Sequence, residues 1–263
     1  MIEIRTRGGR IAAQVLATVA LVPFIAPLAI TFYRSTGGDG FVANYRAVIE
    51  RPEFLHFFRN SLVIALGAVL LTWVCTMLAS FALACLHVRG REVAFYLLVG
   101  ALALPTAALT VPLSIAIRSL DLYDNPLAVV LPIAALGIAF SIFLARAFMA
   151  EIPDEILKAA RVDGASTFGV FRHIILPMTR PISAVIIVWA FVGSWNEYLL
   201  PLLFLQETDK QTITLLPSYF VGQFGADLPK LYAATFLISL PTVACYAAFS
   251  RFFERGLLAG SLK

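Results

Sequence analysis

Long apolar runs alternate with short polar connections along this chain. A transmembrane helix needs about 20 consecutive, mainly apolar residues, and six runs of 23 to 26 residues meet that requirement. The pattern therefore predicts six membrane-spanning helices, at about residues 11–33, 61–86, 93–117, 127–149, 181–204 and 231–253. Prolines 105, 112, 132 and 241 lie inside these runs, so we expect kinked or interrupted helices whose freed carbonyl groups are satisfied by neighbouring helices.

The composition is that of a membrane protein. Of the 263 residues, 60% are hydrophobic and 14% are charged, whereas a soluble domain has about 45–50% apolar and about 25% charged residues. These values exclude a soluble enzyme, a disordered regulator and a secreted disulfide scaffold. The net charge of +4 fits the lysine and arginine excess that orients membrane proteins, so we expect no nucleic-acid partner.

Lysine and arginine are distributed unevenly among the connections. The N-terminus, residues 87–92, residues 146–180 and the tail from 251 hold 13 of them, and the other three connections hold 7. Because cytoplasmic connections carry the positive excess, we expect both termini and the 150–180 loop in the cytoplasm. Arg5, Arg7 and Arg10 precede the first run as in a signal peptide, but that run exceeds the usual length of about 7–15 residues, and we interpret it as an uncleaved first span.

Signals for chemistry on this chain are absent. The sequence has no G-x-x-x-x-G-K-[ST], H-E-x-x-H or G-x-S-x-G motif. Its three histidines are far apart in sequence, and its three cysteines lie in apolar stretches without C-x-x-C spacing, as small hydrophobic residues do. We therefore expect no catalytic residues, no metal site and no cofactor on this chain, and any energy for driven work must come from another chain.

The longest hydrophilic connection, residues 150–180, predicts a helix–glycine–helix unit. Pro153 is suited to open a helix, and Asp154 and Glu155 in its first turn complement the helix dipole. Gly164 interrupts the helix, and a second helical stretch follows until Pro177 ends it. So short a unit cannot bury its apolar face alone, so it must dock either on its own bundle or on a cytoplasmic partner.

This connection resembles the EAA loop of ABC-importer permeases, whose pattern is E-A-A, three residues, glycine, nine residues and I-x-L-P. The matching residues are Lys158-Ala159-Ala160, Asp163-Gly164-Ala165 and Ile174-Ile175-Leu176-Pro177. Most of the chain beyond about residue 44 is similar to the carbohydrate-uptake permeases of the maltose-transporter type. The further matching segments are Asn60-Ser61-Leu62, Pro105 and Pro112, Ile152-Pro153, Trp195-Asn196-Glu197-Tyr198, and Arg255-Gly256-Leu257 to Lys263.

The resemblance implies an all-α, polytopic membrane protein with about six transmembrane helices and the ABC type I importer permease fold, forming one permease domain over residues 1–263. It implies half of a translocation pore in a bacterial or archaeal cytoplasmic (inner) membrane, surrounded by lipid. The implied partners are a second homologous permease subunit, two cytoplasmic ATPase subunits that bind ATP and Mg, and an extracytoplasmic solute-binding protein. The chain itself is then a non-catalytic subunit.

The resemblance also assigns coupling to the ATPase to the 150–180 loop. The residues implied are Glu155, Lys158, Ala159, Ala160, Asp163, Gly164, Ala165, Ile174, Leu176 and Pro177. The sequence departs from the family at Lys158, where the motif has glutamate. Either Glu155, one helical turn earlier on the same face, takes that role, or the ATPase carries a complementary change. A second departure is Cys85, where the family often has arginine.

Glu197 is a carboxylate well inside the predicted fifth span. Counted from Pro181, it lies about 24 Å along a helix that rises about 1.5 Å per residue. An ionisable group at such depth usually faces the bundle interior or a water-filled cavity. Two interpretations stay open: a substrate pathway, or a structural hydrogen bond to the partner permease with the tryptophan in an interfacial belt. The candidate pathway residues are Trp195, Asn196, Glu197 and Tyr198.

The sequence thus favours a permease of an ATP-driven importer for a sugar or sugar-like solute. The same architecture suits a non-sugar solute such as a polyol, a glycerol phosphoester or a peptide. An intramembrane enzyme or a structural membrane subunit is the alternative of a different class, although one isolated Glu197 does not supply convergent catalytic groups. A secondary transporter would show more buried ionisable residues.

Overall fold

The computed structural model describes residues 7–223 and 225–260. Arg5 and the last residues of the family-like C-terminal segment lie outside this range. The chain forms two compact units, Met1–Leu55 with Leu216–Leu240 and His56–Leu215 with Pro241–Lys263. The long helix α12 (Leu228–Gly260) contributes to both units, with Pro241 inside it.

The first unit joins two helices through a polar turn. Helix α1 (Arg7–Ser35) and helix α2 (Phe41–Ile49) meet where the Ser35 and Tyr45 hydroxyl groups lie 2.9 Å apart. Asn44 Nδ2 donates to the carbonyl oxygens of Ser35 and Gly37 at 2.9 and 2.7 Å. Lys230 Nζ lies 3.1 Å from Asp39 Oδ2 and 2.7 Å from Asp227 Oδ2, which ties this turn to the start of α12.

The same unit contains the one sheet found in the described residues. The 3₁₀ helix η4 (Ile213–Phe220), which begins in the second unit, leads into strand β1 (Val221–Gly222). Strand β1 pairs antiparallel with β2 (Gly225–Ala226), with Val221 opposite Ala226 and Gly222 opposite Gly225. This hairpin of two short strands leaves the fold otherwise helical.

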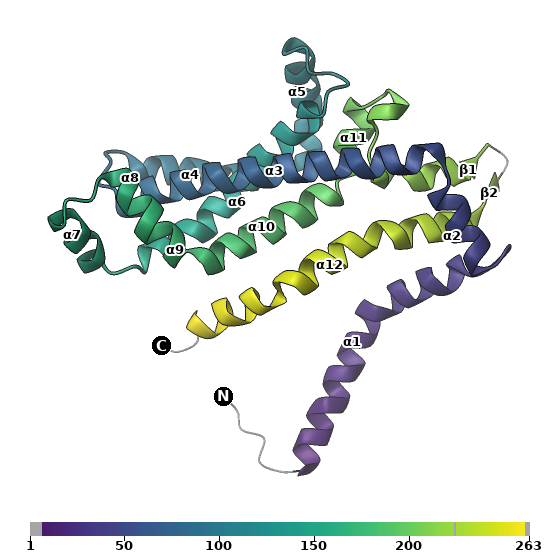
Figure 1. The fold of residues 1–263 in the computed structure, drawn as a ribbon, viewed down its shortest axis with the longest axis horizontal. Helices are drawn as coiled ribbons and strands as arrows, with labels where there is room; N and C mark the ends of the chain where they lie inside the picture. Colours follow the sequence, from purple (N-terminus) through teal and green to yellow (C-terminus); the bar gives the residue numbers. More distant parts are fainter. Residues whose placement is uncertain (1–6, 224, 261–263) are drawn as a thin grey trace. The chain divides into compact units, whose positions relative to one another are not determined.

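The second unit is a helical bundle built around three long helices. Figure 1 shows α3 (Pro52–Cys85), α6 (Leu127–Ala150) and α10 (Arg180–Trp195) running alongside one another. Small residues line their contacts: Val130 lies 3.4 Å from the position of a Cβ at Gly67, and Thr72 lies 3.5 Å from that at Gly137. Small residues let transmembrane helices approach closely, so this packing is typical of a membrane bundle.

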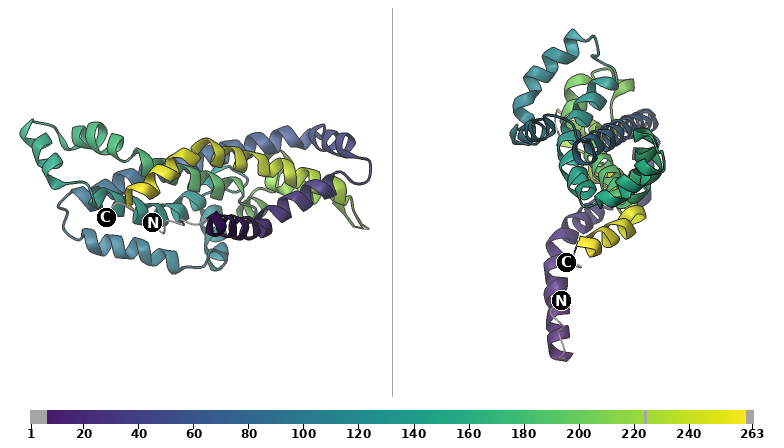
Figure 2. Two further views of the ribbon diagram at one scale, coloured as in Figure 1. Left: turned by 90° about the horizontal axis from the view of Figure 1, so that it is seen from below. Right: turned by 90° about the vertical axis from the view of Figure 1, so that its left-hand side faces the viewer.

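The predicted third span is broken. Helix α4 (Arg91–Gly100) continues as η1 (Ala101–Ala103), and α5 (Thr106–Ser119) then leaves at 105°. Pro105 lacks an N–H group and holds Leu104 in an extended conformation, with ψ 119°. Figure 2 shows this angled arm on the outside of the second unit, and none of the α4 residues is buried.

The remaining segments are short. Between α6 and α10 lie α7 (Asp154–Val162), α8 (Thr167–Val170), the π-helix η2 (Phe171–Ile175) and α9 (Leu176–Met178). After α10 come α11 (Leu199–Phe204) and the 3₁₀ helix η3 (Thr208–Lys210).

Four described helices are long and apolar enough to cross a membrane, namely Gly8–Ser35, Pro52–Cys85, Leu127–Ala150 and Leu228–Phe249. The number rises to six if each of two bent helix pairs forms one span. These pairs are Arg91–Ala103 with Thr106–Ser119, and Thr167–Met178 with Arg180–Trp195. The first pair bends inside the predicted third span, which is therefore interrupted, and the second pair bends at Thr179, just before the predicted fifth span.

Candidate functional site

Helix α7 has well-defined ends. Asp154 and Glu155 lie in its first turn and Arg161 in its last, as the helix dipole favours. At its C-terminal end, Ala165 N donates to Ala160 O at 3.0 Å and Gly164 N donates to Arg161 O at 3.1 Å. This pair of bonds is a Schellman motif, which needs a residue with positive φ. Gly164 supplies it with φ +81°, and a Cβ there would meet nothing within 4 Å.

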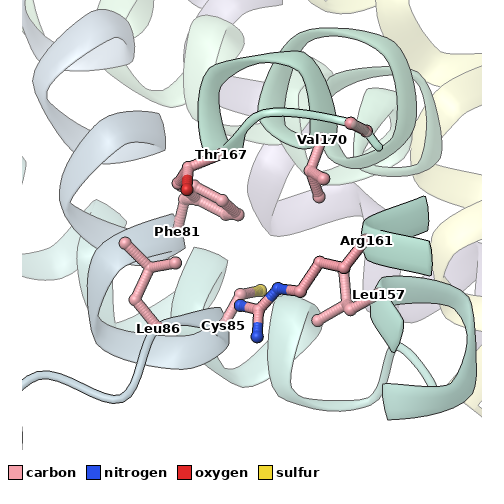
Figure 3. A pocket seen from close by; sticks show the side chains of 8 residues that line it. Phe81, Cys85, Leu86, Leu157, Arg161, Thr167 and Val170 are labelled. Atoms are coloured by element: carbon pink, nitrogen blue, oxygen red, sulfur yellow. The ribbon is translucent and has the colours of Figure 1, made fainter. Parts of the chain in front are cut away.

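One face of α7 is anchored on the bundle. Leu157 and Ala160 are buried in an apolar cluster with side chains of α3, α6, α8 and η2. A cavity of about 20 Å³ remains at this contact, and the Arg161 side chain extends across it toward Cys85. Figure 3 shows the side chains that line it, among them Phe81, Cys85, Leu86, Leu157, Arg161, Thr167 and Val170.

The opposite face of α7 is exposed. Glu155, Lys158, Ala159 and Val162 follow one another at spacings of three, one and three residues, and all four are exposed. Val162 is 87% exposed, and Phe168 on α8 is 64% exposed. In the described part of the chain, neither the Glu155 nor the Lys158 side chain forms an ion pair or hydrogen bond. This outer face therefore presents unpaired charges beside apolar groups.

The second helical stretch runs further than the sequence predicts. Ser166 Oγ accepts from Gly169 N at 3.1 Å and caps α8. The chain then stays helical through Pro177 to Met178 because the wider turns of η2 precede the proline. The helix ends at Thr179, whose Oγ1 donates to Ile175 O at 2.7 Å, and α10 leaves at 78°. The expectation that Pro177 ends the helix is wrong.

The residues assigned to ATPase coupling separate into two groups. Ala160 is buried and Ala165, Ile174 and Leu176 are partly buried, all within the apolar cluster at the base of the loop. The exposed residues are Glu155, Lys158, Ala159, Asp163, Gly164 and Pro177. The sequence pattern did not single out Val162 and Phe168 as exposed, because periodicity alone counts them with the apolar residues that pack inward.

The predicted fifth span ends early. Helix α10 stops at Trp195, and Asn196 to Tyr198 form a non-helical break before α11. Pro201 explains the break: it has no N–H group to donate to the Glu197 carbonyl, as a continuous helix requires. Thr214 Oγ1 donates to that carbonyl instead, at 2.9 Å. Glu197 therefore lies in a break between helices and not within a continuous helix.

The four candidate pathway residues have different surroundings. Trp195 is 1% exposed, between the rings of Phe58 and Phe191 at centroid distances of 5.4 and 5.7 Å. Asn196 Nδ2 donates to Val192 O at 2.8 Å and Thr242 Oγ1 at 3.3 Å. Asn196 and Tyr198 are exposed. The structure thus brings Trp195 into the core and leaves the others accessible.

Glu197 caps the next helix. Its Oε1 accepts hydrogen bonds from Leu199 N at 2.9 Å and Leu200 N at 3.1 Å. The half-buried carboxylate also borders a groove of about 190 Å³ between α3, α5, α6 and α10. Trp189, which the sequence pattern did not single out, lines the same groove and is 55% exposed. Its signal was the spacing of Trp189, Gly193 and Glu197 at four-residue intervals.

No group of three or more His, Cys, Asp or Glu side chains is placed to hold a metal ion in the described residues. The cysteines Cys75, Cys85 and Cys245 are free thiols. What the geometry provides is a bundle of broken membrane helices and a loop with one anchored and one exposed face. These features define the transmembrane subunit of a transporter.

The chain belongs to the family described as binding-protein-dependent transport system inner membrane component, whose model matches residues 76–258. It is 31% identical to the osmoprotective compounds uptake permease protein GgtD of Synechocystis sp., over 99% of this chain and 84% of that protein. It is 33% identical to the lactose transport system permease protein LacG of Rhizobium radiobacter, over 84% and 79% of the two chains.

A solved structure shares the fold. One chain of the crystal structure of a bacterial ABC transporter involved in the import of the acidic polysaccharide alginate superposes with a TM-score of 0.80. The match covers 95% of this chain and 99% of that chain at 18% identity. The predicted all-α importer permease fold is therefore confirmed.

Membership of this family settles the class of protein. The chain is a membrane-embedded permease subunit of a binding-protein-dependent ABC transporter, and it works in a complex with an ATPase and a binding protein. It is a non-catalytic subunit, and the prediction of a permease is confirmed. An intramembrane enzyme and a structural subunit are excluded.

Proposed function

We propose that this permease forms half of the translocation pathway of an importer for a sugar or sugar-like solute. Relatives of this chain are named for lactose, for alpha-glucosides, and for melibiose, raffinose and stachyose. The complete importer contains a second homologous permease, two ATPase subunits with ATP and Mg, and an extracytoplasmic binding protein, in the cytoplasmic membrane of a bacterium or archaeon. No cofactor is held by the permease itself.

The proposal that the permease is coupled to the ATPase rests on the exposed outer face of α7. Its apolar Val162 and Ala159 and its unpaired Glu155 and Lys158 are exposed, while Leu157 and Ala160 hold the helix on the bundle. A helix anchored on one side and docked on the other acts as a rigid lever. Closure of the ATPase subunits on ATP then moves the bundle as a body.

Each residue of the loop has a role in this proposal. Glu155, Lys158 and Ala159 contact the ATPase, and small Ala159 permits a close approach. Asp163 and Gly164 shape the turn. Ala160, Ala165, Ile174 and Leu176 transmit movement to the bundle through the apolar cluster that they share, and Pro177 precedes the bend into α10.

The solute pathway in this proposal passes the break after α10. Glu197, Asn196 and Tyr198 border the pathway, and Trp195 fixes the end of α10 from inside the bundle. An intramembrane carboxylate commonly marks a substrate pathway, which supports this placement.

Reconstitution tests the proposed function. The permease is assembled with its partner permease, ATPase and binding protein in proteoliposomes, and uptake of radiolabelled lactose, melibiose and raffinose is measured with ATP. We expect ATP-dependent uptake of at least one sugar, and hydrolysis stimulated by the binding protein. The permease purified alone serves as the control and should hydrolyse no ATP.

A non-sugar solute is the second candidate. The relative GgtD, whose name specifies osmoprotective compounds, matches 99% of this chain. Uptake of radiolabelled glycerol and glycine betaine in the same vesicles, without uptake of any of the three sugars, would support this alternative and contradict the sugar proposal.

Orientation is tested separately. We propose that both termini and the 150–180 loop are cytoplasmic. In a cysteine-free background, the exposed position Ser166 is replaced by cysteine and intact cells are treated with a membrane-impermeant maleimide. We expect labelling only after the cells are opened. Labelling of Ser166→Cys in intact cells would contradict the orientation.

A further inference from the structure

The groove beside Glu197 combines polar groups with an aromatic surface. Its lining includes Trp189, Gly193 and Glu197 along one side of α10 and the break after it, and Thr106 at the start of α5. A Cβ at Gly193 would meet nothing within 4 Å, so the space above this glycine is open. Ligand sites in proteins are concave and mainly apolar, with a few placed polar groups, and this groove has that composition.

Trp189 exposes 55% of its surface at a depth where tryptophan is not expected to be exposed. Counted from Arg180, the charged residue that begins α10, Trp189 lies about 14 Å along the helix at about 1.5 Å per residue. That is near the middle of a hydrocarbon core about 30 Å thick, whereas tryptophans of the aromatic belt lie at the interfaces. Its recorded ring neighbour is Phe140, at a centroid distance of 4.8 Å and a tilt of 37°.

Glu197 has one carboxylate oxygen in use and one available. Oε1 accepts from Leu199 N and Leu200 N. Among the described residues, Oε2 has no hydrogen bond and the carboxylate has no ion pair. An ionised carboxylate accepts hydroxyl donors strongly. The capping bonds fix the orientation of this group, so the free oxygen is held in place beside the groove.

The broken third span contributes the opposite side. Thr106 follows the break at Leu104 and Pro105, and no side chain caps the first N–H groups of α5. In transporters, discontinuous membrane helices mark solute sites because their free backbone groups and helix ends are available to the solute. Thr106, at the uncapped start of α5, thus lines the same groove as Glu197.

We infer that this groove binds one sugar ring of the transported solute, an inference that rests on the proposed function. The apolar face of the ring lies on Trp189, a ring hydroxyl donates to Glu197 Oε2, and Thr106 contacts the ring from α5. A volume of about 190 Å³ is below the range of about 300–1,000 Å³ for sites that enclose a drug-sized ligand. The rest of a longer sugar therefore extends through the open side of the groove.

Uptake by variants tests this inference in the reconstituted complex, with lactose, melibiose and raffinose as probes. Trp189→Ala should lower the rate of sugar uptake at low concentration about tenfold, and Trp189→Phe should restore most of it because a flat ring remains. Glu197→Gln should lower it by about 10- to 100-fold, since hydrogen bonds to charged groups are worth about 1.5–3 kcal/mol. Phe143→Ala, an exposed aromatic residue of α6 outside the groove, is the matched control and should transport normally.

Cysteine labelling gives a second measurement that does not depend on the Trp189 and Glu197 variants folding correctly. Gly193→Cys is placed in a cysteine-free background, and its alkylation by N-ethylmaleimide is measured during turnover with and without the transported sugar. We expect the sugar to slow labelling of Gly193→Cys at least fivefold and to leave Val192→Cys, one residue away and outside the groove, unchanged. Equal labelling with and without sugar, or full uptake by Trp189→Ala, would overturn the inference.

The two proposals fail in different ways. If the wild-type complex takes up none of the three sugars, the proposed function fails. If the wild-type complex takes up a sugar while the Trp189 and Glu197 variants transport normally, the function stands and the groove is not the site.

Discussion

The loop around α7 and the break after α10 are both interruptions of helix, but they leave their polar groups in different conditions. At α7, Gly164 makes the turn and the charges of Glu155 and Lys158 remain unpaired on the surface. At the break, Pro201 removes a backbone donor and the chain supplies a replacement from Thr214. The first region leaves its charged side chains exposed and unpaired, whereas the second satisfies its backbone internally.

The two regions differ because water surrounds the outer face of α7, whereas the break after α10 lies within a predicted membrane span. Water satisfies an exposed charge until a partner replaces it, so unpaired groups on α7 are stable. Within hydrocarbon, an unsatisfied backbone group costs several kcal/mol, and irregular backbone is tolerated only where protein or a water-filled cavity surrounds it. The capping bonds of Glu197 and the bond from Thr214 meet that requirement.

The largest expected effect in this comparison comes from Gly164→Phe. A non-glycine residue at φ +81° is strained by about 1–2 kcal/mol, and the bulky ring would project from a surface that we propose to be docked. We expect uptake to fall more than tenfold while the complex still assembles in part, measured as sugar uptake and stimulated ATP hydrolysis.

Gly90→Phe is the matched control, because Gly90 has the same φ of +81° and equally open surroundings outside this loop. It should carry the same strain and retain coupling. Wild-type uptake by Gly164→Phe would show that the loop does not sit in a tight groove.

Val162→Asp tests whether the exposed apolar groups of α7 bind the ATPase. A buried valine contributes about 1.5 kcal/mol or more, so a charge in its place should weaken binding of the ATPase about tenfold or more. Affinity is measured by titrating detergent-solubilised permease with the ATPase. Val42→Asp, at a valine of α2 that is 74% exposed, should bind normally. Equal binding by both variants would contradict a contact between Val162 and the ATPase.

Thr214→Val tests the internal satisfaction of the break. Losing the donor to the Glu197 carbonyl should destabilise the complex by about 1–2 kcal/mol, the cost of an unsatisfied buried acceptor. The thermal unfolding midpoint of the purified complex should fall, while binding of the ATPase stays normal. Thr208→Val, at an exposed threonine, is the control. An unchanged midpoint for Thr214→Val would mean that the break does not depend on this bond.

The smallest expected effects concern the two charges of α7. Exposed ion pairs are worth about 0.2–1 kcal/mol, so we expect changes in ATPase affinity of about two- to fivefold. If Glu155 makes the contact, Glu155→Gln weakens binding and Lys158→Glu is tolerated. If the ATPase offers an acidic surface to Lys158, the reverse holds.

Both effects should shrink as salt is raised, because salt screens exposed charges. If Glu155→Gln and Lys158→Glu both leave the affinity for the ATPase and sugar uptake unchanged, neither charge contributes to docking. Docking would then depend on Val162, Ala159 and the turn at Gly164.

The sequence alone determined the class of protein, the positions of most helices and the interruptions at Gly164 and Pro105, whereas it predicted no break after Trp195. Apolar runs of membrane length, the loop motif and Gly164 are local signals, and local chemistry fixes their outcome: a proline cannot donate, and a glycine accepts positive φ. Pro105 interrupts the third span as predicted.

Only the tertiary structure decided which side chains are buried and which are free. The sequence singled out Trp195 and not Trp189, yet Trp195 is buried between Phe58 and Phe191 and Trp189 is 55% exposed. Thr214 reaches Glu197 across 17 positions of chain, and Val162 remains outside the apolar cluster that encloses Leu157. Periodicity identifies apolar positions without identifying what covers them, because burial depends on neighbours that only the folded chain brings together.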